Sequence, residues 1–152
     1  MGAVVGLLLS ATSFGQDRSE DRDKPTPVTS NEIVDDLDGS EDEYYYRFSV
    51  GPGKVTITFE VTAAETNAGA HLDLFDTRWK PLLSSVLAQG VDKGSERVIK
   101  TINSAKGRDI IMRIKGIKYG SSGGTGSYKI RFEGAIVIKP TTAPGNTPAN
   151  GN

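Results

Sequence analysis

The feature that most constrains this chain is an alternation of apolar and polar side chains with a period of two residues. It is clearest in residues 55–61, where Val55, Ile57, Phe59 and Val61 alternate with threonine and glutamate. Successive side chains of a β-strand point to opposite faces. The pattern therefore predicts strands that bury one face and expose the other.

Similar alternating runs, together with short apolar runs such as residues 82–87 and 135–138, recur along most of the chain. About eight runs occur, at residues 44–50, 55–61, 72–75, 82–87, 98–102, 110–114, 128–132 and 135–138. Turn signals such as Gly51-Pro52-Gly53 separate them, and no segment carries the capped apolar stripe of an amphipathic helix. We therefore expect an all-β fold, an antiparallel β-sandwich of jelly-roll type with about eight strands.

Composition divides the chain into four parts. Residues 31–139 contain the alternating runs and form the expected sandwich domain. Residues 16–30 are charged and proline-containing, which predicts a disordered linker, and residues 140–152 are a low-complexity segment typical of a disordered tail. Residues 1–15 have the apolar run and small residues of a signal peptide, although no basic residue precedes the run. The alternative is an apolar tail on a cytoplasmic protein.

Cysteine content and charge exclude several classes of protein. The chain has no cysteine, which excludes disulfides, thiolate metal sites and cysteine nucleophiles. Its 18 basic and 19 acidic residues lack the basic excess of nucleic-acid-binding proteins. The N-terminal apolar run is shorter than the about 20 residues needed to span a membrane. We expect a monomer that is secreted, periplasmic or on the cell surface.

Acidic residues are concentrated just before the first aromatic run. Asp36, Asp38 and Asp42, with Gly39 supplying a turn, are candidate ligands for calcium, which takes six to eight oxygen ligands. The alternative is a solvated, charged segment that keeps an edge strand from aggregating. No other cofactor is expected.

Two aromatic residues are candidate ligand-binding residues. Tyr45 is on the opposite strand face from Tyr44 and Tyr46, so one of these two faces is expected to be exposed. Trp79 stands between two basic residues in an expected turn. Exposed aromatic rings bind sugars and extended peptides, but a tryptophan in a sandwich loop more often packs over the edge of the core, and we favour packing for Trp79.

Four segments in order resemble the bacterial pre-peptidase C-terminal domain family. They are Asp42–Gly53, Leu72–Asp76 followed by Lys80–Ser85, Arg108–Ile114 and Gly126–Phe132, within a stretch of about residues 31–134. The resemblance implies a non-catalytic jelly-roll sandwich of the kind found beside secreted proteases. Some members of the family bind collagen or polysaccharide, so the resemblance also implies a polymer ligand. Other members bind calcium through acidic residues near the first strand, so it implies a calcium site there.

The sequence does not contain a recognisable catalytic motif. No Gly-x-Ser-x-Gly elbow follows an expected strand and precedes a helix. The glycine-rich residues 120–126 lack the lysine of a phosphate-binding loop, and His71 is the single histidine. We expect a non-enzymatic binding or accessory module that recognises an extracellular polysaccharide or protein, or assists an exported enzyme. The alternatives are a structural or pro-segment-like domain without a ligand, and a small secreted hydrolase.

Overall fold

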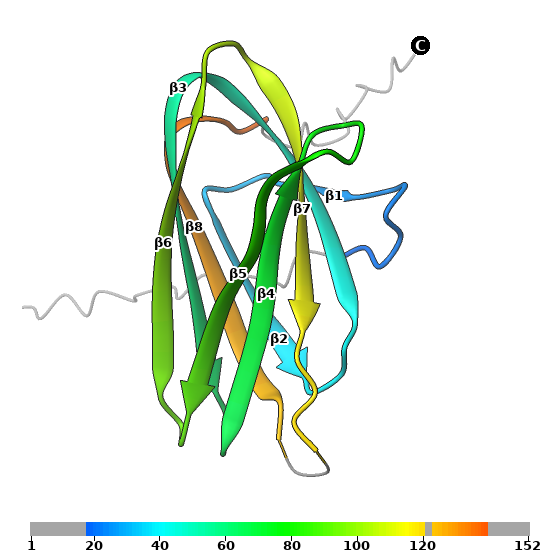
Figure 1. Ribbon diagram of the computed structural model, residues 1–152, viewed down its shortest axis with the longest axis vertical. Coiled ribbons are helices and arrows are strands. Elements are labelled where there is room, and N and C mark those ends of the chain that lie inside the picture. The colour runs from blue at the N-terminus through cyan, green and yellow to red at the C-terminus, as the bar shows by residue number, and fades with distance from the viewer. Residues whose placement is uncertain (1–17, 121–122, 140–152) are drawn as a thin grey trace, which may run out of the picture.

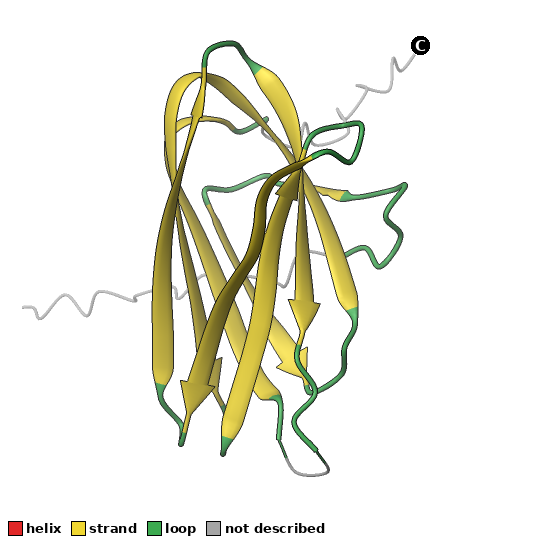
Figure 2. Cartoon of the chain, in the orientation of Figure 1, coloured by secondary structure: helices red, strands yellow, loops and turns green. Residues whose placement is uncertain are grey.

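The computed structural model describes residues 18–120 and 123–139, so the expected signal peptide and tail lie outside the described residues. Every regular element in these residues is a strand (Figure 2), which confirms the all-β fold. No helix long and apolar enough to cross a membrane occurs in them. The strands are β1 (Thr26–Pro27), β2 (Glu32–Asp38), β3 (Glu43–Ala63), β4 (Asn67–Phe75), β5 (Pro81–Val91), β6 (Ser95–Ser104), β7 (Arg108–Gly116) and β8 (Thr125–Val137).

The strands pack in two layers that share β3. The first layer has the strand order β2-β8-β3-β6 and contains the C-terminal half of β3. The second layer has the order β1-β3-β7-β4-β5 and contains the N-terminal half of β3. All neighbours are antiparallel except β1, which is parallel to β3. In Figure 1, β4 and β5 pass in front of β2 and β8, and apolar side chains from both layers form one core. The predicted β-sandwich is confirmed, and its jelly-roll type stays a prediction.

The strand β3 changes layers at Gly51-Pro52-Gly53. Its buried side chains have even numbers from Tyr44 to Val50 and odd numbers from Val55 to Val61, apart from Tyr45. The register with β8 shifts between Val50 and Val55, and Gly53 has a φ of 124°, which residues with a side chain rarely adopt. The segment predicted as a turn between two strands is therefore an irregularity within one 21-residue strand.

Two further strand assignments differ from the expectation. The acidic lead-in forms β2, in which Ile33 and Leu37 are buried against the core and Val34 is exposed. The last predicted run continues β8 without a break, because Gly134 accommodates the bend with a φ of 99°. The total of eight strands in the described residues thus agrees with the prediction, although the segments that form them are not all the same.

Two buried tyrosines connect the layers across the core. The hydroxyl oxygens of Tyr46, in β3, and Tyr128, in β8, lie 2.7 Å apart, and the two residues are 0% and 1% exposed. A buried hydroxyl without a partner costs about 1–3 kcal/mol. The pair therefore favours the one relative position of the layers in which both hydroxyls are satisfied.

The tyrosine pair makes folding stability sensitive to alkaline pH. Burial raises the pKa of Tyr46 to about 12, although its hydrogen bond with Tyr128 works against the rise, and burial also raises the pKa of Tyr128. Unfolded tyrosine loses its proton near pH 10. Between about pH 10 and pH 12 the folded state keeps protons that the unfolded state loses, so stability falls as pH rises.

We expect the free energy of unfolding to decrease above pH 10 by up to about 1.4 kcal/mol per pH unit for each of the two tyrosines. Urea titrations between pH 9 and pH 11 measure it. Tyr128→Phe should give a shallower decrease. A free energy of unfolding that stays constant over this range would contradict the assignment.

Gly126 allows β8 to pack directly on its neighbours. A Cβ atom at this position would overlap the carbonyl oxygen of Thr62 and lie 2.8 Å from the Cβ of Ala68. Gly126→Ala should therefore lower the free energy of unfolding by about 1–3 kcal/mol, measured by urea denaturation. Gly51→Ala is the control, because its nearest neighbour would be 3.8 Å away. Equal stability of the two variants would rule out this packing.

Candidate functional site

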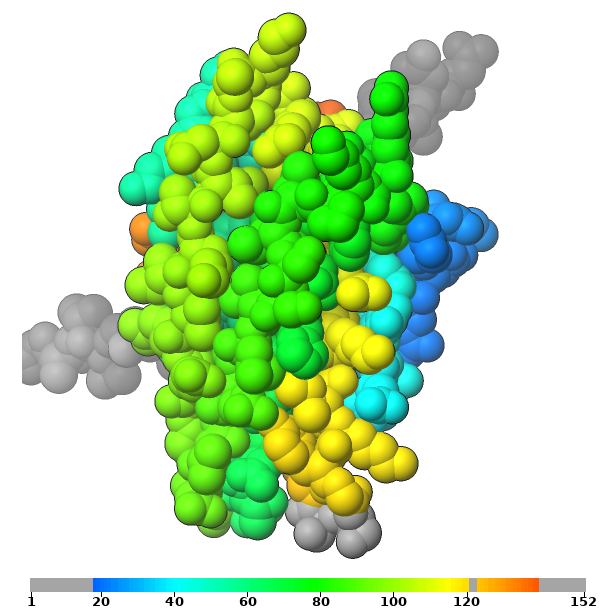
Figure 3. Space-filling model, viewed as in Figure 1, coloured from blue at the N-terminus to red at the C-terminus, as the bar shows by residue number. Residues whose placement is uncertain are grey.

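Residues 18–28, here called the N-terminal strap, lie along the free edge of the N-terminal half of β3. Tyr45 N donates to Ser19 O at 2.8 Å, and Val28 N donates to Arg47 O at 2.9 Å. Between these contacts, Thr26 in β1 pairs with β3. Figure 3 shows the strap (blue) on the surface beside β3 (cyan). The prediction of a disordered linker over residues 16–30 is therefore wrong for its described part, because this backbone supplies hydrogen bonds to an unpaired strand edge.

Arg18 holds the start of the strap against both layers. Its guanidinium lies 3.3 Å from the Asp35 carboxylate and 3.8 Å from the centre of the Tyr44 ring, and it donates to the carbonyl of Asp36. Burial alone would lower the pKa of Arg18, but Asp35, Tyr44 and Tyr128 together outweigh burial and raise it. This partly buried cation connects the strap to β2 and to β3.

The aromatic candidates are packed together on the outer face of the layer that contains β7. The Tyr45 ring meets the Trp79 ring edge to face at 5.9 Å, and Phe75 lies 5.4 Å from Trp79. The Arg22 guanidinium covers the indole at 4.1 Å. Tyr44, Tyr45 and Tyr46 are all buried, so the expectation that one of these two strand faces is exposed is wrong. The Trp79 ring lies against Tyr45, and Ser19 of the strap pairs with its backbone. Trp79 is half-buried, which agrees with the packing that the sequence favoured.

The loop before β5 fixes the position of Trp79. Trp79 has a φ of 64°, and its N–H donates to Asp76 O at 3.0 Å. The Asp76 carboxylate accepts hydrogen bonds from Lys80 N at 2.9 Å and Arg78 N at 2.8 Å, which lower the pKa of Asp76. A non-glycine residue at positive φ is retained only where its surroundings determine the conformation. The local hydrogen bonds therefore aim Trp79 at the outer face.

A charged network stiffens the sheet beneath this aromatic cluster. Arg113 in β7 lies 3.1 Å from Asp73 in β4 and 3.4 Å from Glu43 in β3. Asp73 is 4% exposed and also accepts a hydrogen bond from Ser85 N at 2.8 Å. The Tyr45 hydroxyl donates to Glu43, and burial, followed by that carboxylate, raises the pKa of Tyr45. Three adjacent strands are thereby held in a fixed register.

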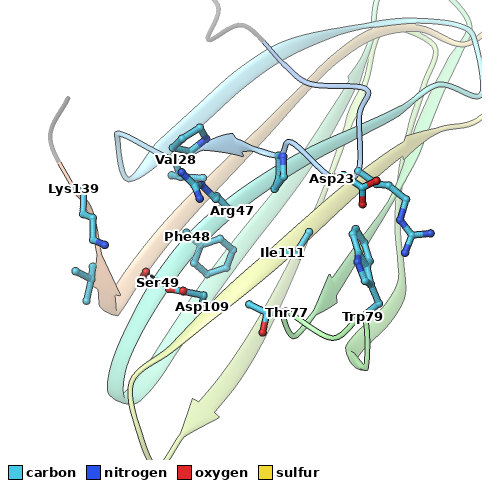
Figure 4. Close-up of a pocket in the computed structure, with 14 residues that line it drawn as sticks. Asp23, Val28, Arg47, Phe48, Ser49, Thr77, Trp79, Asp109, Ile111 and Lys139 are labelled. Carbon is cyan, nitrogen blue, oxygen red and sulfur yellow. Dashed lines mark hydrogen bonds between the residues drawn. The ribbon is translucent and has the colours of Figure 1, made fainter. Parts of the chain in front are cut away.

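A cavity of about 450 Å³ opens between the strap and this outer face. We call it the strap groove. Figure 4 shows Trp79 at one end and Lys139 at the other, with Arg47, Ser49 and Asp109 between them. The groove is lined by the strap, β3, the loop before β5, β7 and the end of β8. Segments distant in sequence thus form one elongated surface.

The lining of the strap groove combines apolar walls with charges of both signs. Phe48, Ile111 and Val137 contribute apolar surface. The cations are Arg22, Arg47 and Lys139, and the carboxylates are Asp23 and Asp109. Ser49 Oγ donates to an Asp109 carboxylate oxygen at 2.5 Å, which fixes that carboxylate at the groove floor.

The three aspartates predicted to bind calcium are not gathered into a metal site. Asp36 and Asp42 are exposed, and the Asp38 carboxylate accepts bonds from Ser40 Oγ at 2.6 Å and Ser40 N at 2.9 Å. These two bonds lower the pKa of Asp38. No group of three or more histidine, cysteine, aspartate or glutamate side chains placed to hold a metal occurs within residues 18–120 and 123–139. Calcium binding stays a prediction.

Comparison of the sequence with protein-family models finds no matching family, and comparison with curated proteins finds no match. The resemblance to pre-peptidase C-terminal domains, with the secretion and ligands it implies, therefore stays a prediction. The fold and the groove are the findings on which a function can be proposed.

Trp79 is a groove residue that the sequence indicates as a candidate, whereas the other groove residues are not indicated by it. Arg22 belongs to the segment predicted as a linker. Arg47 and Asp109 occupy polar positions of alternating runs, which the period of two predicts to face solvent. One signal was available. Arg47 and Ser49 share a strand face with Tyr45, so the expected exposed face already combined a cation, a hydroxyl and an aromatic ring.

The position of the strap can be tested through Trp79, which is the only tryptophan. Arg18→Ala should weaken strap docking by about 1–3 kcal/mol, because it removes a partly buried, charge-assisted contact. Arg22 would then leave the indole, and acrylamide should quench Trp79 fluorescence more strongly. Arg131→Ala, which removes a surface ion pair with Glu32, is the control. Unchanged quenching in Arg18→Ala would contradict strap docking.

Proposed function

We propose that this protein is a non-catalytic binding module that holds a segment of an extracellular polymer in the strap groove. The observation that supports it best is the groove itself. Its volume of about 450 Å³ lies within the range of ligand pockets, and its walls combine apolar surface with charged and hydroxyl groups, as binding sites do. The stiff sheet below the groove would limit the entropy lost when a ligand binds.

An extended ligand suits the groove better than a compact one. The lining residues run along the outer face from Trp79 to Lys139 rather than surrounding a closed chamber (Figure 4). A polymer segment can contact several of these residues in succession. The apolar N-terminal run and the resemblance to domains of secreted proteins support placing the chain in the periplasm, on the cell surface or outside the cell.

A structural module without a ligand is the second candidate. Tyr45 and Trp79, the two residues predicted to bind a ligand, are both used in packing, with Arg22 over Trp79 and Glu43 bonded to Tyr45. A protein of this kind would stabilise a larger exported assembly through its surface. The two candidates differ in whether the isolated protein is retained by a polymer.

Cosedimentation with bead-bound neutral and acidic polysaccharides and with collagen fibrils tests the proposal, with calcium and with EDTA. We expect at least one polymer to retain the protein. Thr77→Trp should reduce affinity about tenfold, because Thr77 is an exposed groove residue and a large ring there obstructs the groove without removing a packed side chain. Trp79→Ala should also reduce affinity.

Ile99→Ala is the matched control, since Ile99 is 60% exposed on β6, away from the groove. It should bind like the wild type. If neither Thr77→Trp nor Trp79→Ala changed retention by the polymer, binding would lie outside the groove. If no polymer retained the protein, the structural module would be favoured.

A further inference from the structure

The cations of the strap groove are not all neutralised by the protein. Within the described part of the chain, neither Arg47 nor Lys139 forms an ion pair, and both line the groove. Arg22 is directed at the Trp79 ring. A cation beside apolar walls interacts more strongly with an anion than it does in open water. The groove therefore offers two positive charges to a ligand.

The carboxylates of the groove restrict which anion fits. Asp109 is held at the floor by Ser49, and Asp23 lies on the strap wall. These carboxylates accept hydrogen bonds from hydroxyl groups and repel densely charged anions. A suitable ligand therefore combines isolated negative charges with many hydroxyl donors.

The groove is a poor partner for an extended peptide. Peptides commonly add a strand to a free sheet edge through main-chain hydrogen bonds. Here the edge of β3 is already paired with Thr26 and Pro27, and Val28 N occupies Arg47 O. Pro25 and Pro27 line the strap wall, and proline has no N–H to donate.

We propose that the strap groove binds an acidic polysaccharide, a polymer of sugar acids. The carboxylate of a sugar acid would lie against Arg47 and Lys139, and ring hydroxyls would donate to Asp109. The apolar faces of the rings would contact Ile111 and the strap prolines. This inference rests on the proposed function and specifies its ligand class.

The test compares acidic polysaccharides with their uncharged methyl esters, and with two polymers of different chemistry. Polygalacturonate and alginate, their methyl esters, a neutral glucan and collagen are immobilised, and the dissociation constant for each is measured. We expect the two acidic polymers to bind most tightly, with at least about tenfold weaker binding after esterification. Added salt should weaken binding to the acidic polymers, because contacts between partly exposed charges are screened.

Variants identify the cations responsible. The double variant Arg47→Gln and Lys139→Gln should lose about tenfold or more of the affinity for polygalacturonate and little of the affinity for its ester. Lys100→Gln, an exposed cation on β6, should bind like the wild type. Unchanged binding of the double variant would overturn the inference even if the acidic polymers are retained.

The remaining outcomes separate this inference from the proposed function. Two results would overturn the acidic ligand class: equal binding of acidic and esterified polymers, or preference for the glucan or collagen. If Thr77→Trp still reduced that binding, the groove would remain the binding site. Absence of binding to every immobilised polymer would overturn both.

Discussion

The passage of β3 through both layers is the constraint on which the remaining structure depends. Its C-terminal half is paired on both sides, by β8 and β6. Its N-terminal half is paired along one side by β7, whereas on the other side β8 reaches only Ser49 and Val50. An unpaired strand edge leaves backbone groups available to another segment. The N-terminal strap pairs with this edge of β3. The strap groove is the space between the strap and the outer face of the layer that contains β7.

The core was predictable because its signal is local. Residues 55–61 alternate without interruption, and Val55, Ile57, Phe59 and Val61 are all buried as the alternation requires. The change of layer was not predictable, because Gly51-Pro52-Gly53 is as typical of a turn between strands as of an irregularity within one. β2 was missed for a related reason, since acidic residues are depleted in strands and its buried residues, Ile33 and Leu37, are four positions apart.

The candidate site could not be predicted, because it forms from segments far apart in the sequence and no local pattern indicates their contacts. The strap is polar apart from Val28 and a few prolines, and its docking depends on a β3 edge that exists only after the layers form. Tyr45 is buried by the strap and Trp79, although its strand position indicates exposure. Asp36 and Asp38 are near in sequence, but in an extended strand they stand about 7 Å apart and their side chains remain in solvent.

The central claim is that the strap is a fixed wall of the groove, and residue-resolved amide hydrogen exchange tests it most directly. The backbone N–H of Tyr45 and of Val28 each donates to the other segment, so docking should slow the exchange of both by orders of magnitude relative to an unstructured peptide. Exchange of these two amides at the unprotected rate, with the amides of β7 protected, would contradict the account.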